Sequence, residues 1–126
     1  MRLLFDEGQM RSPSCRAQFS KVQSLLQVGV PMKTFKVEGR GRYACLHSKA
    51  TLVDEKVLLI GSVNLSTNSL ESNWESFVVI KTKSAPSDFL KVFDALWEKG
   101  VQLTEERLAD YREQASASRS GDYYVP

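Results

Sequence analysis

The side chains that could carry out chemistry gather in one short segment, which begins at the only histidine of the chain. Six residues lie within eighteen positions at the spacing H-x-K-x4-D-x6-G-S-x-N, namely His47, Lys49, Asp54, Gly61, Ser62 and Asn64. A neutral imidazole can attack phosphorus and form a covalent phosphohistidine, which divides one difficult displacement into two easier ones. Lys49 offers a compact positive charge for phosphate oxygens, and Ser62 and Asn64 add hydrogen-bond donors where charge develops. These residue types are therefore suited to phosphodiester chemistry at His47.

Strands are expected to position these residues. We expect a strand at 43–54, a tight turn at 54–56 and an apolar strand at 57–60 that is covered on both faces. Because successive side chains of a strand alternate between faces, His47 and Lys49 should project to one side, and Ser62 and Asn64 should do likewise. Asp54 has the opposite parity and lies at the turn, so we expect a mainly structural role.

Hydrophobic periodicity predicts the remaining elements of the chain. Further strands are expected at 2–5, 32–37 and 76–82, and helices at 14–28, 89–97 and 104–114. Gly29 should end the first helix, and Phe89, Phe93 and Trp97 should lie in the core. The order of strands and helices predicts an α/β fold, with a largely buried mixed sheet between helices. We assign 1–113 to one domain and 114–126 to a disordered C-terminal tail, because the tail contains mostly small polar residues.

Composition and charge add little to this interpretation. The 126 residues are 42% hydrophobic and 25% charged, as in an ordinary globular protein, and the net charge of +2 is too small to indicate a nucleic-acid partner. A basic cluster precedes the histidine, and it consists of Lys33, Lys36, Arg40 and Arg42 with Glu38 as the only opposing charge. This cluster could guide a phosphate group to the site, or it could be a solvated strand and loop.

The two cysteines indicate neither a metal site nor a disulfide. Cys15 and Cys45 lack zinc-ligand spacing, so we expect no metal and no cofactor, and reduced thiols fit a cytoplasmic protein. No apolar run is long enough to predict a transmembrane helix. The first residues are too few and too soon charged to predict a signal peptide.

The motif from His47 to Asn64 resembles the HKD motif of the phospholipase D superfamily, and the similarity extends over about residues 2–99. The resemblance implies that His47 is the nucleophile, that Lys49 and Asn64 bind phosphate, and that Ser62 is a hydroxyl donor. It also implies that Glu75 holds the second ring nitrogen of the histidine and thereby fixes its tautomer. Members of the superfamily begin with a further strand and helix, so the resemblance implies that these are missing here.

A superfamily active site needs two motifs, and this chain has one. Single-motif members, the bacterial endonucleases and the mitochondrial cardiolipin hydrolases, form twofold dimers, so the resemblance implies a homodimer in which a second copy supplies the acid. It leaves the substrate open between phospholipid and nucleic acid, and a mitochondrial surface location follows from resemblance alone. Two alternatives also stay open: a phosphate-binding fragment without activity, and the C-terminal lobe of a two-motif enzyme.

Overall fold

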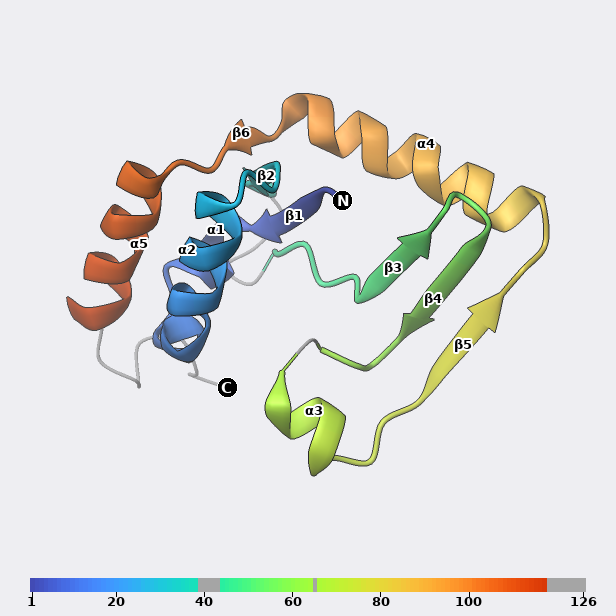
Figure 1. Cartoon of the computed structure of the whole chain (residues 1–126), viewed down its shortest axis with the longest axis horizontal. Coiled ribbons are helices and arrows are strands. Elements are labelled where there is room, and N and C mark those ends of the chain that lie inside the picture. Colours follow the sequence, from blue (N-terminus) through green and yellow to red (C-terminus); the bar gives the residue numbers. More distant parts are fainter. Residues whose placement is uncertain (39–43, 65, 118–126) are drawn as a thin grey trace. The chain divides into compact units, whose positions relative to one another are not determined.

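The computed structural model describes residues 1–38, 44–64 and 66–117 of the chain (Figure 1). These residues form two compact units. Unit 1 contains Met1–Leu46 and Lys99–Pro126, and unit 2 contains His47–Glu98. The basic residues Arg40 and Arg42 lie outside the described residues, as does the tail after residue 117.

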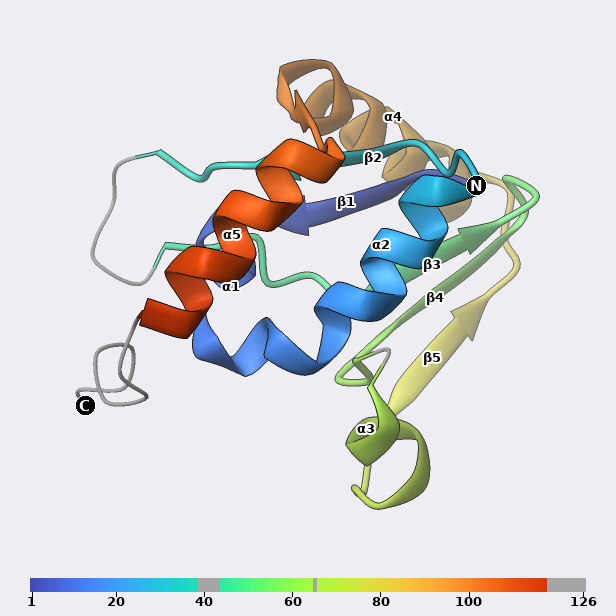
Figure 2. The same cartoon turned by 60° about the vertical axis from the view of Figure 1, so that its left-hand side comes forward.

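Unit 1 is a small α/β layer in which helices cover a three-stranded sheet of order β1-β2-β6. Its strands are β1 (Leu3–Asp6), β2 (Met32–Phe35) and β6 (Val101–Gln102), and its helices are α1 (Glu7–Met10), η1 (Pro13–Gln18), α2 (Phe19–Gln27) and α5 (Glu105–Ala117). Strands β1 and β2 run parallel, and β6 is antiparallel to β2. Figure 2 shows α2 and α5 side by side in front of β1 and β2.

The core of unit 1 explains why these elements pack. Met32 and Ala115 are fully buried and belong to a cluster that also contains Phe19, Leu103 and Tyr111. Residues 114–117, which we assigned to the tail, are helical because α5 continues to Ala117 and buries Ala115 against this cluster. The division into one domain and a tail otherwise stays a prediction.

The predicted end of the first long helix is confirmed. Helix α2 ends at Gln27, and Gly29 follows with a φ of 79°, a left-handed conformation that glycine adopts without strain. The N–H of Gly29 donates to the carbonyl of Leu26 at 2.9 Å, and the N–H of Val30 donates to that of Leu25 at 3.0 Å. These bonds satisfy carbonyls that a helix end otherwise leaves unpaired.

Unit 2 is built on an antiparallel sheet of order β3-β4-β5. It contains β3 (Ala50–Val53), β4 (Val57–Gly61), α3 (Thr67–Glu71), β5 (Phe77–Ile80) and α4 (Ser84–Lys99). The α/β class is thus confirmed, but the predicted single mixed sheet is replaced by two three-stranded sheets. The short elements α1, α3 and β6 were not predicted, because each has too few residues to show a periodicity.

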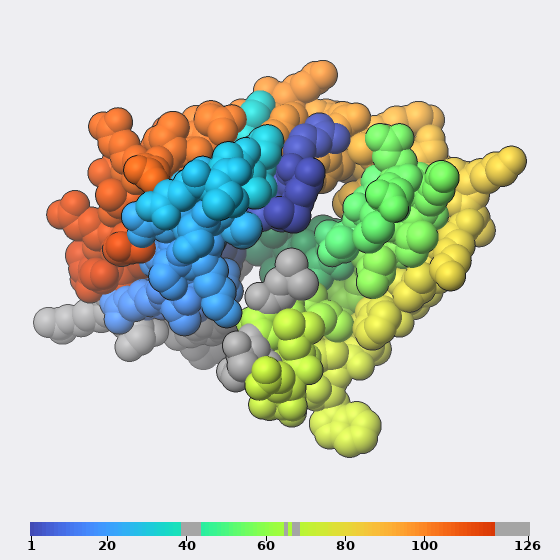
Figure 3. Space-filling model, in the orientation of Figure 1, coloured from blue at the N-terminus to red at the C-terminus, as the bar shows by residue number. Residues whose placement is uncertain are grey.

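The sheet of unit 2 is more exposed than we expected. Leu58 is buried, yet Ile60, two positions further along on the same face, is 40% exposed, so this face of β4 is not covered over its whole length as predicted. Strand β5 lies at the edge of the sheet, and its Val78 is 61% exposed. The side chains of β5 (yellow) are visible on the surface in Figure 3. An apolar run alone does not distinguish a central strand from an edge strand, because both need strand-forming residues.

Helix α4 carries its rings along one face. Phe93 lies 6.3 Å from Phe89 and 5.8 Å from Trp97 between ring centroids. These side chains are half-buried and do not lie in the core as predicted. No helix in the described part of the chain is both long and apolar enough to cross a bilayer.

Candidate active site

The register of the second sheet brings three strand ends together. Ala50, the first residue of β3, pairs with Ile60 near the end of β4, and Gly61 pairs with Phe77, the first residue of β5. Because both pairings are antiparallel, the segments before β3, after β4 and before β5 lie at the same end of the sheet. These segments carry the candidate residues His47, Lys49, Ser62, Asn64 and Glu75.

His47 and Lys49 contact each other directly. Lys49 Nζ lies 2.8 Å from His47 Nε2 and donates to the His47 carbonyl at 3.0 Å. A protonated ammonium can only donate, so this contact fits the tautomer in which Nε2 accepts and Nδ1 carries the ring proton. Residues 44–49 have no strand structure, so the predicted strand at 43–54 is confirmed only for Ala50–Val53. The two side chains meet as expected, but strand alternation is not the cause.

Ser62 and Glu75 form a hydrogen-bonded group at the same end of the sheet. Ser62 Oγ donates to Glu75 Oε2 and accepts from the N–H of Ser76 at 3.2 Å. Asn73 Nδ2 donates to the other carboxylate oxygen of Glu75 at 3.3 Å. Hydrogen bonds lower the pKa of Glu75 below its ordinary value, with the Ser62 hydroxyl as the largest cause and the Ser69 hydroxyl as the next. The nearby charge of Lys49 lowers this pKa further.

We expect Ser62→Ala to raise the pKa of Glu75, because the variant removes the largest cause of its lowering. A lowered folded-state pKa stabilises the fold above the ordinary carboxyl pKa, and this contribution disappears as the pH falls through the folded value. The variant should therefore lose stability at neutral pH and little at acid pH. An NMR titration of the Glu75 carboxyl carbon measures the shift. Ser24→Ala removes a hydroxyl from unit 1 and should leave this titration unchanged.

Gly61 is required for the close approach of β4 and β5. A Cβ atom at this position would lie 2.2 Å from the Ser76 carbonyl oxygen and 2.6 Å from Phe77 Cα. Both are backbone atoms, so the clash could not be relieved by rotating a side chain. The glycine of the motif thus has a steric role, which spacing alone did not reveal.

The other predicted site residues lie in different places. Asp54 is in the turn at the opposite end of β3 from His47, with a φ of 51°. Asn64 follows β4 and is exposed, and Lys36 is exposed in unit 1. Among the described residues, Glu75 accepts hydrogen bonds from Ser62, Ser69 and Asn73. The predicted bond between Glu75 and the histidine ring therefore stays a prediction.

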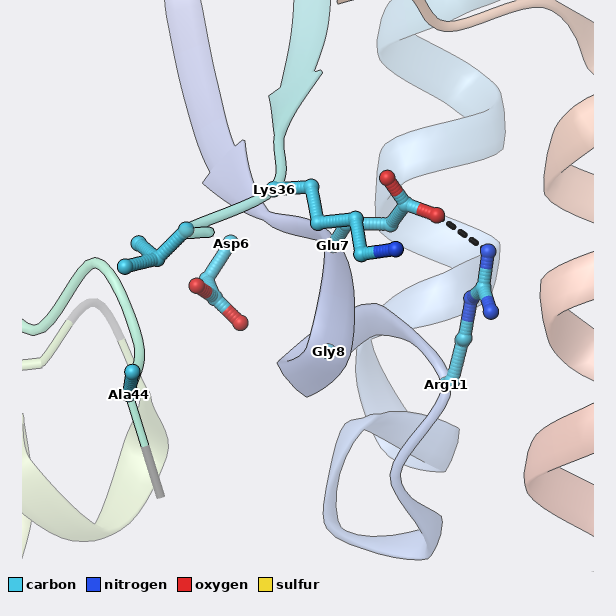
Figure 4. A pocket seen from close by; sticks show the side chains of 7 residues that line it. Asp6, Glu7, Gly8, Arg11, Lys36 and Ala44 are labelled. Atoms are coloured by element: carbon cyan, nitrogen blue, oxygen red, sulfur yellow. Dashed lines mark hydrogen bonds and ion pairs between the residues drawn. The ribbon is translucent and has the colours of Figure 1, made fainter. Parts of the chain in front are cut away.

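Unit 1 contains a pocket that the sequence did not indicate. It lies beyond the end of β1 and is lined by Asp6, Glu7, Gly8, Arg11, Lys36, Val37 and Ala44 (Figure 4). Two of the lining residues pair with each other, since Arg11 donates to Glu7, as the dashed line in the figure marks. The signal that could have revealed this site is an aspartate at the end of an apolar strand, where its carboxylate becomes buried.

A family model described as "Cardiolipin synthase, PLD-like domain" matches residues 1–97. Cardiolipin synthase 1 of Staphylococcus aureus is 29% identical over 94 residues, which are 75% of this chain and 18% of that protein. Mitochondrial cardiolipin hydrolase of Canis lupus familiaris is 33% identical over 54 residues, which are 43% of this chain and 21% of that protein. The chain thus spans about a fifth of the length of these relatives.

Two solved structures share the fold. Nuc from Salmonella typhimurium, described as a phospholipase D family member, superimposes with a TM-score of 0.68 at 23% identity, over 82% of this chain and 64% of that one. NucT from Helicobacter pylori superimposes with a TM-score of 0.52 at 15% identity, over 82% of this chain and 83% of that one. At these identities the likeness concerns the fold.

Proposed function

The chain belongs to the PLD-like domain family of cardiolipin synthase, and from this premise we propose that it is a metal-independent phosphodiesterase that acts through a phosphohistidine at His47. The observation that carries the proposal is the meeting of His47, Lys49, Ser62 and Glu75 at one end of the β3-β4-β5 sheet. A nucleophile, a cation and hydrogen-bond donors in one place are what phosphoryl transfer requires.

The contact between Lys49 and His47 suggests how substrate binding starts the reaction. The ammonium of Lys49 donates to Nε2, the ring nitrogen whose lone pair would attack phosphorus. A phosphate group offers the ammonium stronger, charged acceptors, so Lys49 would turn to a phosphate oxygen and release the Nε2 lone pair. The cation would then stabilise the charge that develops during the displacement.

The chemical steps balance as two displacements. Nε2 attacks phosphorus, the bond to the leaving alkoxide breaks, and the alkoxide takes a proton from an acid on the opposite side. Water then attacks the phosphohistidine, gives up its proton to the same group, and the P–N bond breaks. Since His47 is the only histidine of the chain, we propose that His47 of a second copy is this acid, in a homodimer with one shared site.

A second interpretation of the function follows from how little of its relatives' length this chain spans. This chain matches 18% of a cardiolipin synthase, so it could correspond to one lobe of a longer two-motif enzyme whose other lobe supplies the acid. In that case the isolated chain would bind phosphate without turnover. The names of the relatives favour a cardiolipin-like phospholipid as the substrate, with nucleic acid as the alternative.

The test is hydrolysis in EDTA of bis(p-nitrophenyl) phosphate, of cardiolipin vesicles and of a single-stranded oligonucleotide. We expect turnover of the chromogenic diester and of the vesicles, with a specific activity that rises as protein concentration increases until dimers are complete. Loss of turnover in EDTA would contradict the metal-independent mechanism. Specific activity that does not change down to a strict monomer would contradict the shared site. Preferential cleavage of the oligonucleotide would assign the nucleic-acid alternative.

A further inference from the structure

Asp6 binds two parts of the backbone with one carboxylate, one of them nearby in the sequence and the other forty positions away. It is the last residue of β1 and is 8% exposed. Its Oδ1 accepts from the N–H of Gln9 at 2.8 Å, and its Oδ2 accepts from the N–H of Leu46 at 2.7 Å. Figure 4 shows the carboxylate projecting from the end of β1 towards the segment that carries Ala44. The second bond therefore reaches the residue directly before His47.

We propose that Asp6 is a positioning residue for the nucleophile, an inference that rests on the proposed function. Residues 44–48 belong to no strand, so no ladder of hydrogen bonds fixes the backbone that carries His47. The bond from Leu46 to Asp6 restrains the chain on one side of the histidine. The bond from Gly61 N–H to the Lys49 carbonyl, at 3.3 Å, restrains it on the other. An ionised acceptor makes the first bond stronger than one between neutral groups.

A role as a helix cap does not by itself explain the choice of aspartate. Asp6 caps α1, but a cap needs only one acceptor. Ser12 caps η1 with one hydroxyl, and Thr104 accepts from the N–H of Arg107 with one hydroxyl at 3.2 Å. Asparagine or serine would serve a cap equally well. Only a carboxylate offers a second acceptor, and that acceptor binds Leu46.

Asp6→Asn separates the two roles. The amide oxygen can still cap α1, but the amide nitrogen would place a donor against the N–H of Leu46. Asp6→Ser also keeps a capping oxygen and is too short to bind both donors. Thr104→Ala is the matched control, because it removes a helix cap in unit 1 that binds the N–H of Arg107.

The chain has one histidine, so its imidazole NMR signals need no assignment. In Asp6→Asn we expect these signals to shift or broaden and the Leu46 amide to lose at least about tenfold in exchange protection. We expect kcat to fall at least about tenfold with KM within about twofold, because displacement of the nucleophile affects the reaction more than binding. Thr104→Ala should lower Tm and leave the imidazole signals and kcat unchanged.

Each result decides the proposal. If Asp6→Asn folds and leaves both the His47 signals and kcat as in the parent, Asp6 is only a helix cap. If the variants do not fold, hydrogen exchange in the parent protein tests the proposal instead. Rapid exchange of the Leu46 amide in the native parent would overturn the inference. If the parent lacks turnover, the proposed function fails, and the NMR readouts still show whether Asp6 positions His47.

Discussion

Replacing His47 by asparagine should lower kcat by at least about 10 000-fold, because the variant lacks the atom that forms the covalent bond to phosphorus. Asparagine is similar in size and keeps a hydrogen-bonding group. His47 is exposed, so the free energy of unfolding should change by no more than about 0.5 kcal/mol. Steady-state hydrolysis of bis(p-nitrophenyl) phosphate measures the loss. Rapid quenching of the parent into alkali, in which a P–N bond persists, should trap phosphohistidine that is absent from the variant.

Mixing the two proteins tests whether a site is shared between copies. If every site needs the histidine of both subunits, only the dimers of two parent chains are active. A fully exchanged mixture of equal parts should then keep about a quarter of the activity of the same total amount of protein that is all parent. Independent sites would keep about half. Ser24→Ala, a substitution in unit 1, serves as the mixing control and should keep full activity. Turnover that persists in His47→Asn at the parental rate would refute the mechanism.

The sequence indicated which residues meet at the strand ends better than it predicted the sheet around them. The strand ends that hold the site could be inferred, because the apolar runs at β4 and β5 and the turn after β3 specify antiparallel neighbours. The length of β3 could not be inferred. Leu46 lies in a segment that was predicted to be a strand, but its N–H donates to Asp6, which is forty positions away in the chain. No local pattern shows that a backbone donor has a side-chain partner so distant.

The same limit applies to Gly61 and Glu75. Spacing marked Gly61 as part of a motif, yet its steric role depends on Ser76 and Phe77 of the neighbouring strand. Glu75 was selected by resemblance, and the hydrogen bonds that lower its pKa come from residues on both sides of a chain reversal. Features of this kind arise from tertiary pairing, so periodicity and spacing locate the residues without stating what they contact.

The steric role of Gly61 leads to the second large effect. Gly61→Ala should lower the free energy of unfolding by about 3 kcal/mol, because the new methyl would overlap the backbone of Ser76 and Phe77. Separation of β4 from β5 at this end would also disturb the bonds of Ser62 to Glu75 and Ser76. Activity should therefore fall even at temperatures where the variant stays folded. Urea denaturation measures the first effect, and hydrolysis at low temperature measures the second.

Gly29→Ala distinguishes this clash from the general cost of replacing a glycine. Gly29 has open space around its Cα but a φ of 79°, so alanine there should cost about 1 kcal/mol through backbone strain alone. It lies in unit 1 and should leave kcat unchanged. Alanine at Gly61 should instead be destabilising because its methyl would contact another strand. If Gly61→Ala proves no more destabilising than Gly29→Ala, β4 and β5 do not approach as closely as the structure shows. In that case the hydrogen-bonded group of Ser62 and Glu75 would no longer support the proposed site.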